Sequence, residues 1–283
     1  MIVCDTERCR RCGQCIEVCH EHCMTLTEDS LQIDYDLCST CAQCIALCPH
    51  QALSWDGVRP SSFNTELLPS PEQLTELLRE RRTTRKFTPD KIDHGLLEEI
   101  IGCGVYAPTN NYAFRVIAID DDAVIAELDA VIQRWNRLIY RLFYQSRIVA
   151  WLIGSVWRVR DYVQARPKVE ASLRRGHAIH RAAAMILVVG DRRTPLSIDS
   201  AQYALYNMIL YAQVKGIGSC LWGPGRLSLN RSRATRERLG LDRHERIFGS
   251  MLLGYPAVKF KNRVEGKTLP IQLNTSPQSA REP

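Results

Sequence analysis

Eight cysteines near the start of the chain stand in two runs of identical spacing, C-x2-C-x2-C-x3-C. The runs are CRRCGQCIEVC at 9–19 and CSTCAQCIALC at 38–48. Thiolates this close repel one another, and they persist when a metal centre absorbs their charge. A zinc site usually takes two separated C-x2-C pairs. Here three thiolates can hold three corners of a cubane while the fourth points toward another cluster, so the spacing predicts two four-iron clusters.

The two runs also form an internal repeat. A constant offset relates Cys9 to Cys38 and Cys19 to Cys48. Such a repeat predicts a domain with pseudo-twofold symmetry and one cluster in each half.

Residues 1–56, which contain both runs, resemble the bacterial two-[4Fe-4S] ferredoxins. His20 follows Cys19 where that family usually has proline, and Cys4 and Cys23 are additional thiols. Cys23 could compete with Cys19 as a ligand, or it could be a buried thiol. The resemblance implies a first cluster on Cys9, Cys12, Cys15 and Cys48 and a second on Cys38, Cys41, Cys44 and Cys19.

Charge is distributed unevenly along the chain of 283 residues. Residues 1–56 contain nine Asp and Glu against three Arg, whereas the whole chain carries a net charge of +6. This acidic head (residues 1–56) and the basic body (the remainder of the chain) are predicted to attract each other, or the body is predicted to bind an anionic ligand. Because the arginines are scattered among apolar residues and no recognition motif is present, we expect no nucleic-acid partner.

Neither a membrane span nor a secretion signal is predicted. The longest uncharged apolar run, at 148–157, is too short to cross a bilayer and reads as a buried or lid-forming helix. The N-terminus lacks the apolar stretch of a signal peptide. We therefore expect a cytoplasmic protein whose twelve cysteines are metal ligands more often than disulfides.

Beyond the cysteines, the pattern predicts a linker at 57–70 and a second domain at 71–283 that must position any further site. Ser70 as N-cap, Pro71 and Gln73 predict a capped helix start. Further helices are expected over 93–106 and 200–216, and strands over 115–120, 184–191, 219–222 and 246–254. The stretch 121–183 is predicted to be a helical insertion and is a candidate for a lid over a site.

The stretch RRTTRKF at 81–87 supplies arginine forks and threonine hydroxyls, which suit a phosphate. APTNNYAF, GIGSCLWGPG and GYPAVKFKNR follow it along the chain. In this order they resemble the nitroreductase family of FMN enzymes over about residues 75–270. The resemblance implies an α+β fold, in which an antiparallel-rich mixed sheet is wrapped by helices, and a homodimer with FMN at its interface.

The resemblance also implies roles for individual residues. The opening basic segment would hold the FMN phosphate and ribityl chain, a late basic pair would close on that phosphate, and the proline loop would reach the flavin from the partner subunit. The end of a strand would lie along the isoalloxazine ring, with the Gly223 N–H donating to flavin N5. In that order, the residues are Arg81, Arg82, Thr83 and Arg85; Lys261 and Arg263; Pro108, Thr109 and Asn110; and Leu221, Trp222 and Gly223.

Two nearby features are ambiguous in the sequence. GCGVYA at 102–107 fits G-x-G-x-x-A, but it ends a predicted helix and runs into Pro108, so we interpret it as no dinucleotide site. Cys220 could be a redox thiol near the flavin or a packed core cysteine.

Taken together, the patterns predict an FMN-dependent oxidoreductase. Electrons would pass from a low-potential donor such as a ferredoxin, rather than from NAD(P)H, through two [4Fe-4S] clusters to FMN and then to a small organic acceptor. The acceptor could be a nitroaromatic, a quinone or an activated C=C bond. Two alternatives are an electron-transfer module that serves a protein partner and a structural zinc protein.

Overall fold

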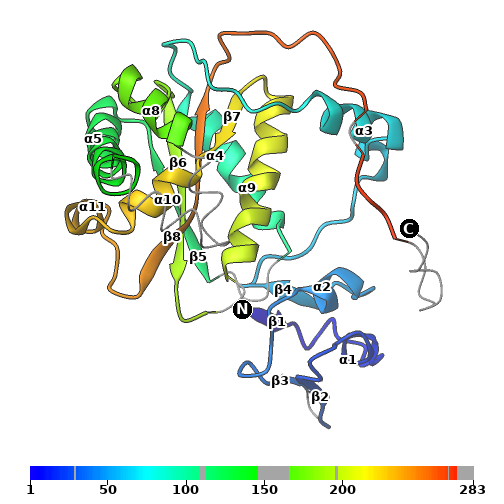
Figure 1. The fold of residues 1–283 in the computed structure, drawn as a ribbon. Helices are drawn as coiled ribbons and strands as arrows, with labels where there is room; N and C mark the ends of the chain where they lie inside the picture. The colour runs from blue at the N-terminus through cyan, green and yellow to red at the C-terminus, as the bar shows by residue number, and fades with distance from the viewer. Residues whose placement is uncertain (29, 109–112, 146–165, 195–196, 267, 273–283) are drawn as a thin grey trace, which may run out of the picture.

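The computed structural model describes the chain except residues 29, 109–112, 146–165, 195–196, 267 and 273–283. A small N-terminal unit carries the cysteine runs, and a larger unit is built around a four-stranded sheet (Figure 1). The apolar run at 148–157, for which a buried or lid-forming helix is predicted, lies outside the described residues. None of the described helices is long and apolar enough to cross a membrane.

The N-terminal unit repeats itself in three dimensions. Each half contributes two short strands and one short helix, and the offset that relates the cysteine runs also relates the strands of one half to those of the other. The elements are β1 (Ile2–Cys4) paired antiparallel with β4 (Leu53–Trp55), β2 (Met24–Leu26) paired antiparallel with β3 (Leu31–Ile33), α1 (Gln14–Glu17) and α2 (Gln43–Leu47).

Left-handed backbone shapes both cysteine loops at equivalent positions. Arg11 and Gly13 have φ of 56° and 80°, and Thr40 and Ala42 have φ of 53° and 61°. A left-handed residue turns the chain back sharply, so that thiols near it in the sequence can face the same space. The pseudo-symmetry predicted from the repeat is therefore present in the backbone.

The larger unit has the sheet order β5-β6-β8-β7, and every pair of neighbours is antiparallel. Thr83 adds a parallel bridge to Ser219 at the β7 edge, which makes the sheet mixed and antiparallel-rich, as predicted. Seven consecutive residues of β6 are buried, so both of its faces must be covered. The strands are β5 (Phe114–Ile119), β6 (Ala184–Asp191), β7 (Gly218–Leu221) and β8 (Glu245–Gly254).

Helices cover both faces of this sheet (Figure 1). One face packs against α4 (His94–Gly102) and α9 (Ser197–Val214), and the other against α5 (Asp122–Ile139) and α10 (Gly223–Leu229). The remaining described helices of the larger unit are α3 (Pro71–Glu80), a π-helical turn (Tyr140–Tyr144), α8 (Arg166–Arg175), α11 (Arg233–Arg238) and the 3₁₀ helix Cys103–Tyr106. The described part of 121–183 that precedes β6 is thus mainly helical.

The start of α3 confirms the predicted capping box. The Ser70 hydroxyl accepts from the Gln73 N–H, and the Gln73 side chain accepts from the Ser70 N–H. Leu74 and Leu78 on α3 are 44% and 43% exposed, so the apolar face of this helix is only partly covered by the rest of the protein. Residues 57–70 ahead of it are largely irregular, with one 3₁₀ turn at Thr65–Leu67.

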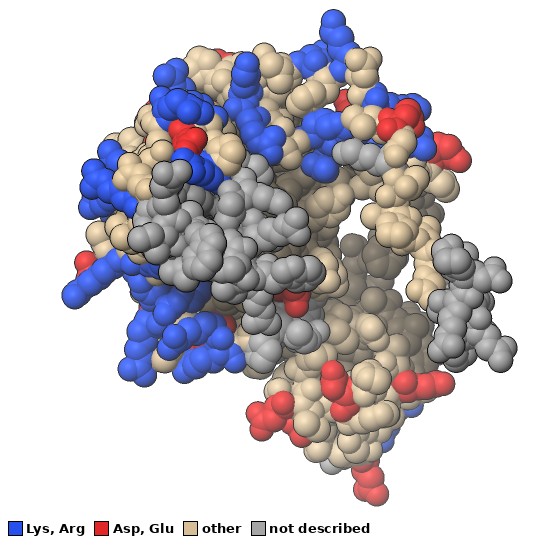
Figure 2. Space-filling model, in the orientation of Figure 1, with Lys and Arg blue, Asp and Glu red and all other residues tan. Residues whose placement is uncertain are grey.

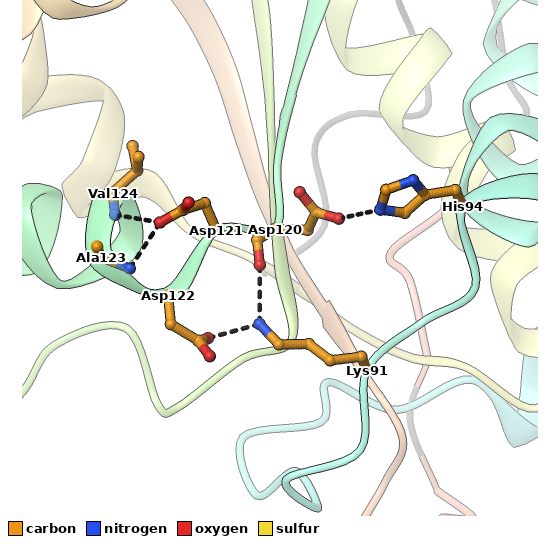
Figure 3. Close-up of polar contacts among 7 residues, drawn as sticks. All are labelled: Lys91, His94, Asp120, Asp121, Asp122, Ala123 and Val124. Atoms are coloured by element: carbon orange, nitrogen blue, oxygen red, sulfur yellow. Dashed lines mark hydrogen bonds and ion pairs between the residues drawn. The ribbon is translucent and has the colours of Figure 1, made fainter.

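A polar corner fixes the point where β5 becomes α5 (Figure 3). Asp121 caps α5 by accepting from the N–H groups of Ala123 and Val124 at 2.8 and 3.0 Å, and these bonds lower its pKa. Lys91 donates to the Asp120 carbonyl at 2.8 Å, and His94 contacts the Asp120 carboxylate at 2.6 Å. These contacts tie the entry to α4 to the far end of β5.

Charge divides along the same two units. Figure 2 shows red side chains gathered on the N-terminal unit and blue ones gathered over the larger unit. The acidic head and the basic body of the sequence are therefore separate surfaces in the structure.

Candidate functional site

The thiols of the N-terminal unit line two cavities. Each cavity brings together four of the predicted ligands, in the two sets that the ferredoxin resemblance implies, and adds a fifth cysteine. The first is lined by Cys9, Cys12, Cys15, Cys48 and also Cys4; the second is lined by Cys19, Cys38, Cys41, Cys44 and also Cys23.

These thiols are suited to a metal cluster by their surroundings. Burial raises the pKa of Cys44 to about 12, so a proton or a metal must neutralise it at neutral pH. Among the described residues, no three His, Cys, Asp or Glu side chains converge closely enough to hold one metal ion. The cysteines instead surround a space, which fits a multi-iron cluster with one thiolate at each corner.

Cys19 differs from its counterpart Cys48 in what contacts its sulfur. Cys48 Sγ accepts from the Ala52 N–H at 3.3 Å, whereas Cys19 Sγ lies 3.4 Å from Cys23 Sγ. Although burial acts to raise it, the pKa of Cys19 is lowered, because hydrogen bonds from Cys23 and neighbouring N–H groups favour the thiolate.

A second candidate site is a basic groove beside α3, with a volume of about 730 Å³. Its lining joins the segment at 81–85 to the segment at 260–266, near the other end of the chain. The groove includes Arg81, Arg82, Thr83, Arg85 and Arg263. Lys261 lies exposed on the same late segment but is not among the lining residues.

Backbone pairing explains why these distant segments meet. The Thr84 N–H donates to the Ser219 carbonyl at 2.9 Å, which joins the segment to β7. The Thr88 N–H donates to the Tyr255 carbonyl and the Ala257 N–H to the Lys86 carbonyl, both at 2.9 Å. The segment 83–88 is thus held between β7 and the chain leaving β8, and its arginines are brought to the late segment.

The arginines of the groove have few acidic partners. Arg82 donates to the carbonyls of Arg79 and Arg81 at 2.6 and 2.8 Å, and Arg263 pairs with Glu76 at 2.8 Å. A site with this excess of guanidinium groups suits an anion with several oxygens, above all a phosphate.

At the end of β7, the predicted strand–helix junction is present. Trp222 is buried, and its N–H donates to the Ser250 carbonyl at 2.8 Å while its carbonyl accepts from the Ser250 hydroxyl at 2.5 Å. Leu221 is half exposed, and Gly223 begins α10 without a side-chain cap. Pro224 carries no N–H and the Gly225 N–H donates to the Trp222 carbonyl at 3.2 Å, so the Gly223 N–H is the donor of this helix start that is left without a side-chain cap.

Three further predictions have different outcomes. Pro108 is exposed after the 3₁₀ helix, and Thr109 and Asn110 lie outside the described residues. Gly102 ends α4 and leads into that 3₁₀ helix, so GCGVYA lacks the strand that a dinucleotide site needs. Cys220 is buried in the core, and burial raises its pKa, as expected of a packed cysteine.

Sequence reasoning missed a polar turn near Arg85. The Asp129 carboxylate accepts from the N–H groups of Ala178 and Ile179 at 2.7 and 2.8 Å, which fixes the turn before β6. Burial, followed by nearby positive charges that include Arg85, lowers the pKa of His180 in this turn. No local pattern in the sequence connects Asp129 to a turn so far along the chain.

Two family models match separate parts of the chain. Residues 78–255 match the model of the nitroreductase family, and residues 8–52 match that of the 4Fe-4S dicluster domain. No curated protein matches the chain in sequence.

Solved structures resemble the larger unit in fold. A nitroreductase with bound FMN from Desulfitobacterium hafniense DCB-2 is 19% identical with a TM-score of 0.52, covering 70% of this chain and 97% of that one. One from Bacteroides fragilis NCTC 9343, also with bound FMN, is 21% identical with a TM-score of 0.50, covering 71% and 99%. Iodotyrosine deiodinase bound to FMN and 3-iodo-L-tyrosine is 20% identical with a TM-score of 0.51, covering 72% and 100%.

Proposed function

The chain belongs to the nitroreductase family and carries a 4Fe-4S dicluster domain, and from this premise we propose that it is an iron–sulfur flavoprotein oxidoreductase. It binds two [4Fe-4S] clusters and one FMN. The observation that carries the proposal is that one chain joins two cysteine-lined cavities to a basic groove beside α3. FMN, when bound, supplies the ability to take electrons singly and to deliver them in pairs.

In this proposal the groove binds the FMN phosphate. Arg81, Arg82, Thr83 and Arg85 donate to the phosphate and ribityl oxygens, and Arg263 leaves Glu76 to close on the phosphate with Lys261. Leu221 and Trp222 would lie along the isoalloxazine ring, and the Gly223 N–H would donate to flavin N5. Pro108, Thr109 and Asn110 come from the partner subunit of a homodimer.

The N-terminal unit delivers electrons to this site. Cys9, Cys12, Cys15 and Cys48 would hold one cluster and Cys38, Cys41, Cys44 and Cys19 the other. The clusters would take electrons from a low-potential donor such as a ferredoxin, and a small organic acceptor would finally be reduced. The acceptor class is a nitroaromatic, a quinone or an activated C=C bond, and the proposed location is the cytoplasm. The 4Fe-4S dicluster domain in the same chain, which carries electrons singly, supports a ferredoxin rather than NAD(P)H as donor.

The test is an anaerobic visible spectrum of the purified full chain with iron, sulfide and flavin counts. We expect about eight irons and about one FMN per chain. Reduced ferredoxin should bleach both chromophores and NADH should not, and a nitroaromatic or quinone should restore the colour. A colourless protein that contains zinc would refute the proposal, and reoxidation by partner proteins alone would favour an electron-transfer module.

A further inference from the structure

The second cysteine cavity holds one thiol more than a four-cornered cluster needs. Cys23 is 4% exposed, lines this cavity together with the four predicted ligands, and lies with its sulfur 3.4 Å from that of Cys19. Two sulfurs this close on the wall of one cavity can each be brought to the same iron corner by small side-chain rotations, since either thiolate needs to move only a short distance to come within bonding range.

The pseudo-symmetry shows what is special about this position. The residue equivalent to Cys23 in the second half of the repeat is Ala52, whose backbone N–H donates to Cys48 but whose methyl side chain offers no sulfur. The residue after Cys48 is Pro49, whose ring fixes φ, whereas the residue after Cys19 is His20. The first half of the repeat therefore has both a thiol four residues after its last ligand and no proline between the two cysteines.

Backbone contacts hold the two cysteines of this turn in place. The His22 N–H donates to the Cys19 carbonyl at 3.2 Å, and the Asp34 N–H donates to the Cys23 carbonyl at 2.8 Å. Because both main-chain positions are anchored, an exchange between the two sulfurs needs movement of side chains only.

We propose that Cys19 and Cys23 exchange as the fourth ligand of the second cluster. In the exchange the iron–sulfur bond to Cys19 breaks, a bond from the same iron to Cys23 forms, and the thiol proton of Cys23 passes to Cys19 across their contact. No electron is gained or lost, and no other reactant is needed. The inference rests on the proposed function only in that the cavity holds a [4Fe-4S] cluster.

The first test compares the iron content of full-chain variants purified without oxygen. We expect about eight irons per chain in wild type and in Cys19→Ala, and a loss of about half in the double variant Cys19→Ala/Cys23→Ala. The matched control is Cys41→Ala, which leaves the same number of thiols in the cavity, Cys23 included, but should lose about half of the iron. Retention of all iron by this control would overturn the specific pairing of Cys23 with Cys19.

A second test uses the wild-type protein and does not depend on how variants fold. The iron-loaded chain is treated with iodoacetamide, and its labelled cysteines are identified by mass spectrometry alongside an iron count. Exchange predicts chains that carry the label on Cys19 while they keep about eight irons, because labelling traps the Cys23-bound form. Label on Cys23 alone, with Cys19 protected throughout, would overturn the exchange.

The outcomes separate this inference from the proposed function. A wild type with about eight irons whose Cys19→Ala variant loses half of them overturns the exchange and leaves the cluster assignment intact. A wild type without iron overturns both.

Discussion

Replacing Gly218 by alanine tests how the basic groove is built. Gly218 begins β7, and a Cβ there would lie 2.7 Å from the Thr84 hydroxyl oxygen and 2.8 Å from the Thr84 Cβ and Cγ2. Thr84 is buried, and its N–H bonds to Ser219, so it cannot move away alone. The whole segment 83–85 must shift to admit one methyl group.

The expected cost has two parts. Overpacking of a filled core typically costs about 1–3 kcal/mol, which corresponds to about 2–12 °C in Tm for a unit of this size. The shift also displaces Thr83 and Arg85, which we propose contact FMN. Losing one charge-assisted hydrogen bond costs about 1.5–3 kcal/mol, or a rise of about 10- to 150-fold in the Kd for FMN.

The assay combines thermal melting with FMN titration by flavin fluorescence. The matched control is Gly102→Ala at the end of α4, where an added Cβ meets nothing within 4 Å. This control should melt at the wild-type temperature or slightly above it, because alanine favours a helix by about 0.5–1 kcal/mol over glycine. Wild-type melting and wild-type FMN affinity in Gly218→Ala would refute the packing argument and the placement of the groove.

Four further outcomes are expected. Arg263→Ala should raise the Kd for FMN about tenfold and leave that for riboflavin unchanged, because riboflavin lacks the phosphate; an equal rise for both would contradict the assignment. Glu245→Gln should lower the free energy of unfolding by about 1 kcal/mol at pH 7. Because hydrogen bonding to Arg115 lowers the pKa of Glu245, denaturant titrations should show this difference persisting above about pH 4.3 and vanishing as the pH falls through the lowered value. Asp129→Ala should cost about 2 kcal/mol in the same titrations and Asp129→Asn less, because Asn keeps an acceptor for the turn; equal losses would argue against a capping role. Added salt should slow transfer from clusters to flavin in stopped-flow traces if the acidic and basic units dock by charge, and salt-independent rates would exclude that docking.

Local patterns in the sequence were sufficient for much of the fold. The apolar run at 184–191 became β6 with the same bounds, and Ser70 and Gln73 formed their capping box. Both follow from interactions within a few residues, which short stretches specify by themselves. The repeat supplied the pseudo-twofold symmetry, and the resemblance to the two-[4Fe-4S] ferredoxins supplied the two cysteine sets.

The groove could be assigned only by resemblance, because its parts meet through pairing between distant segments. Nothing local in RRTTR says that Thr84 bonds to Ser219, or that Arg263 returns to the same groove. The spacing of the cysteines in the sequence also could not predict the 3.4 Å contact between the sulfurs of Cys19 and Cys23. Two cysteines so near in the sequence can point toward each other or away from each other. The proposed domain boundaries at 56, 57–70 and 71 stay predictions.

The irregular stretch 57–70 also determines how strongly the two units need to bind each other. A fully flexible chain of this length would have a root-mean-square reach of about 20 Å and would confine the acidic unit near the basic one at an effective concentration of about millimolar. A docking affinity far too weak to hold separate proteins together is then enough for frequent encounters. Under the proposed function, the acidic unit would leave after each encounter and present its clusters to the external donor, so such a tether would favour rapid alternation over a permanent interface.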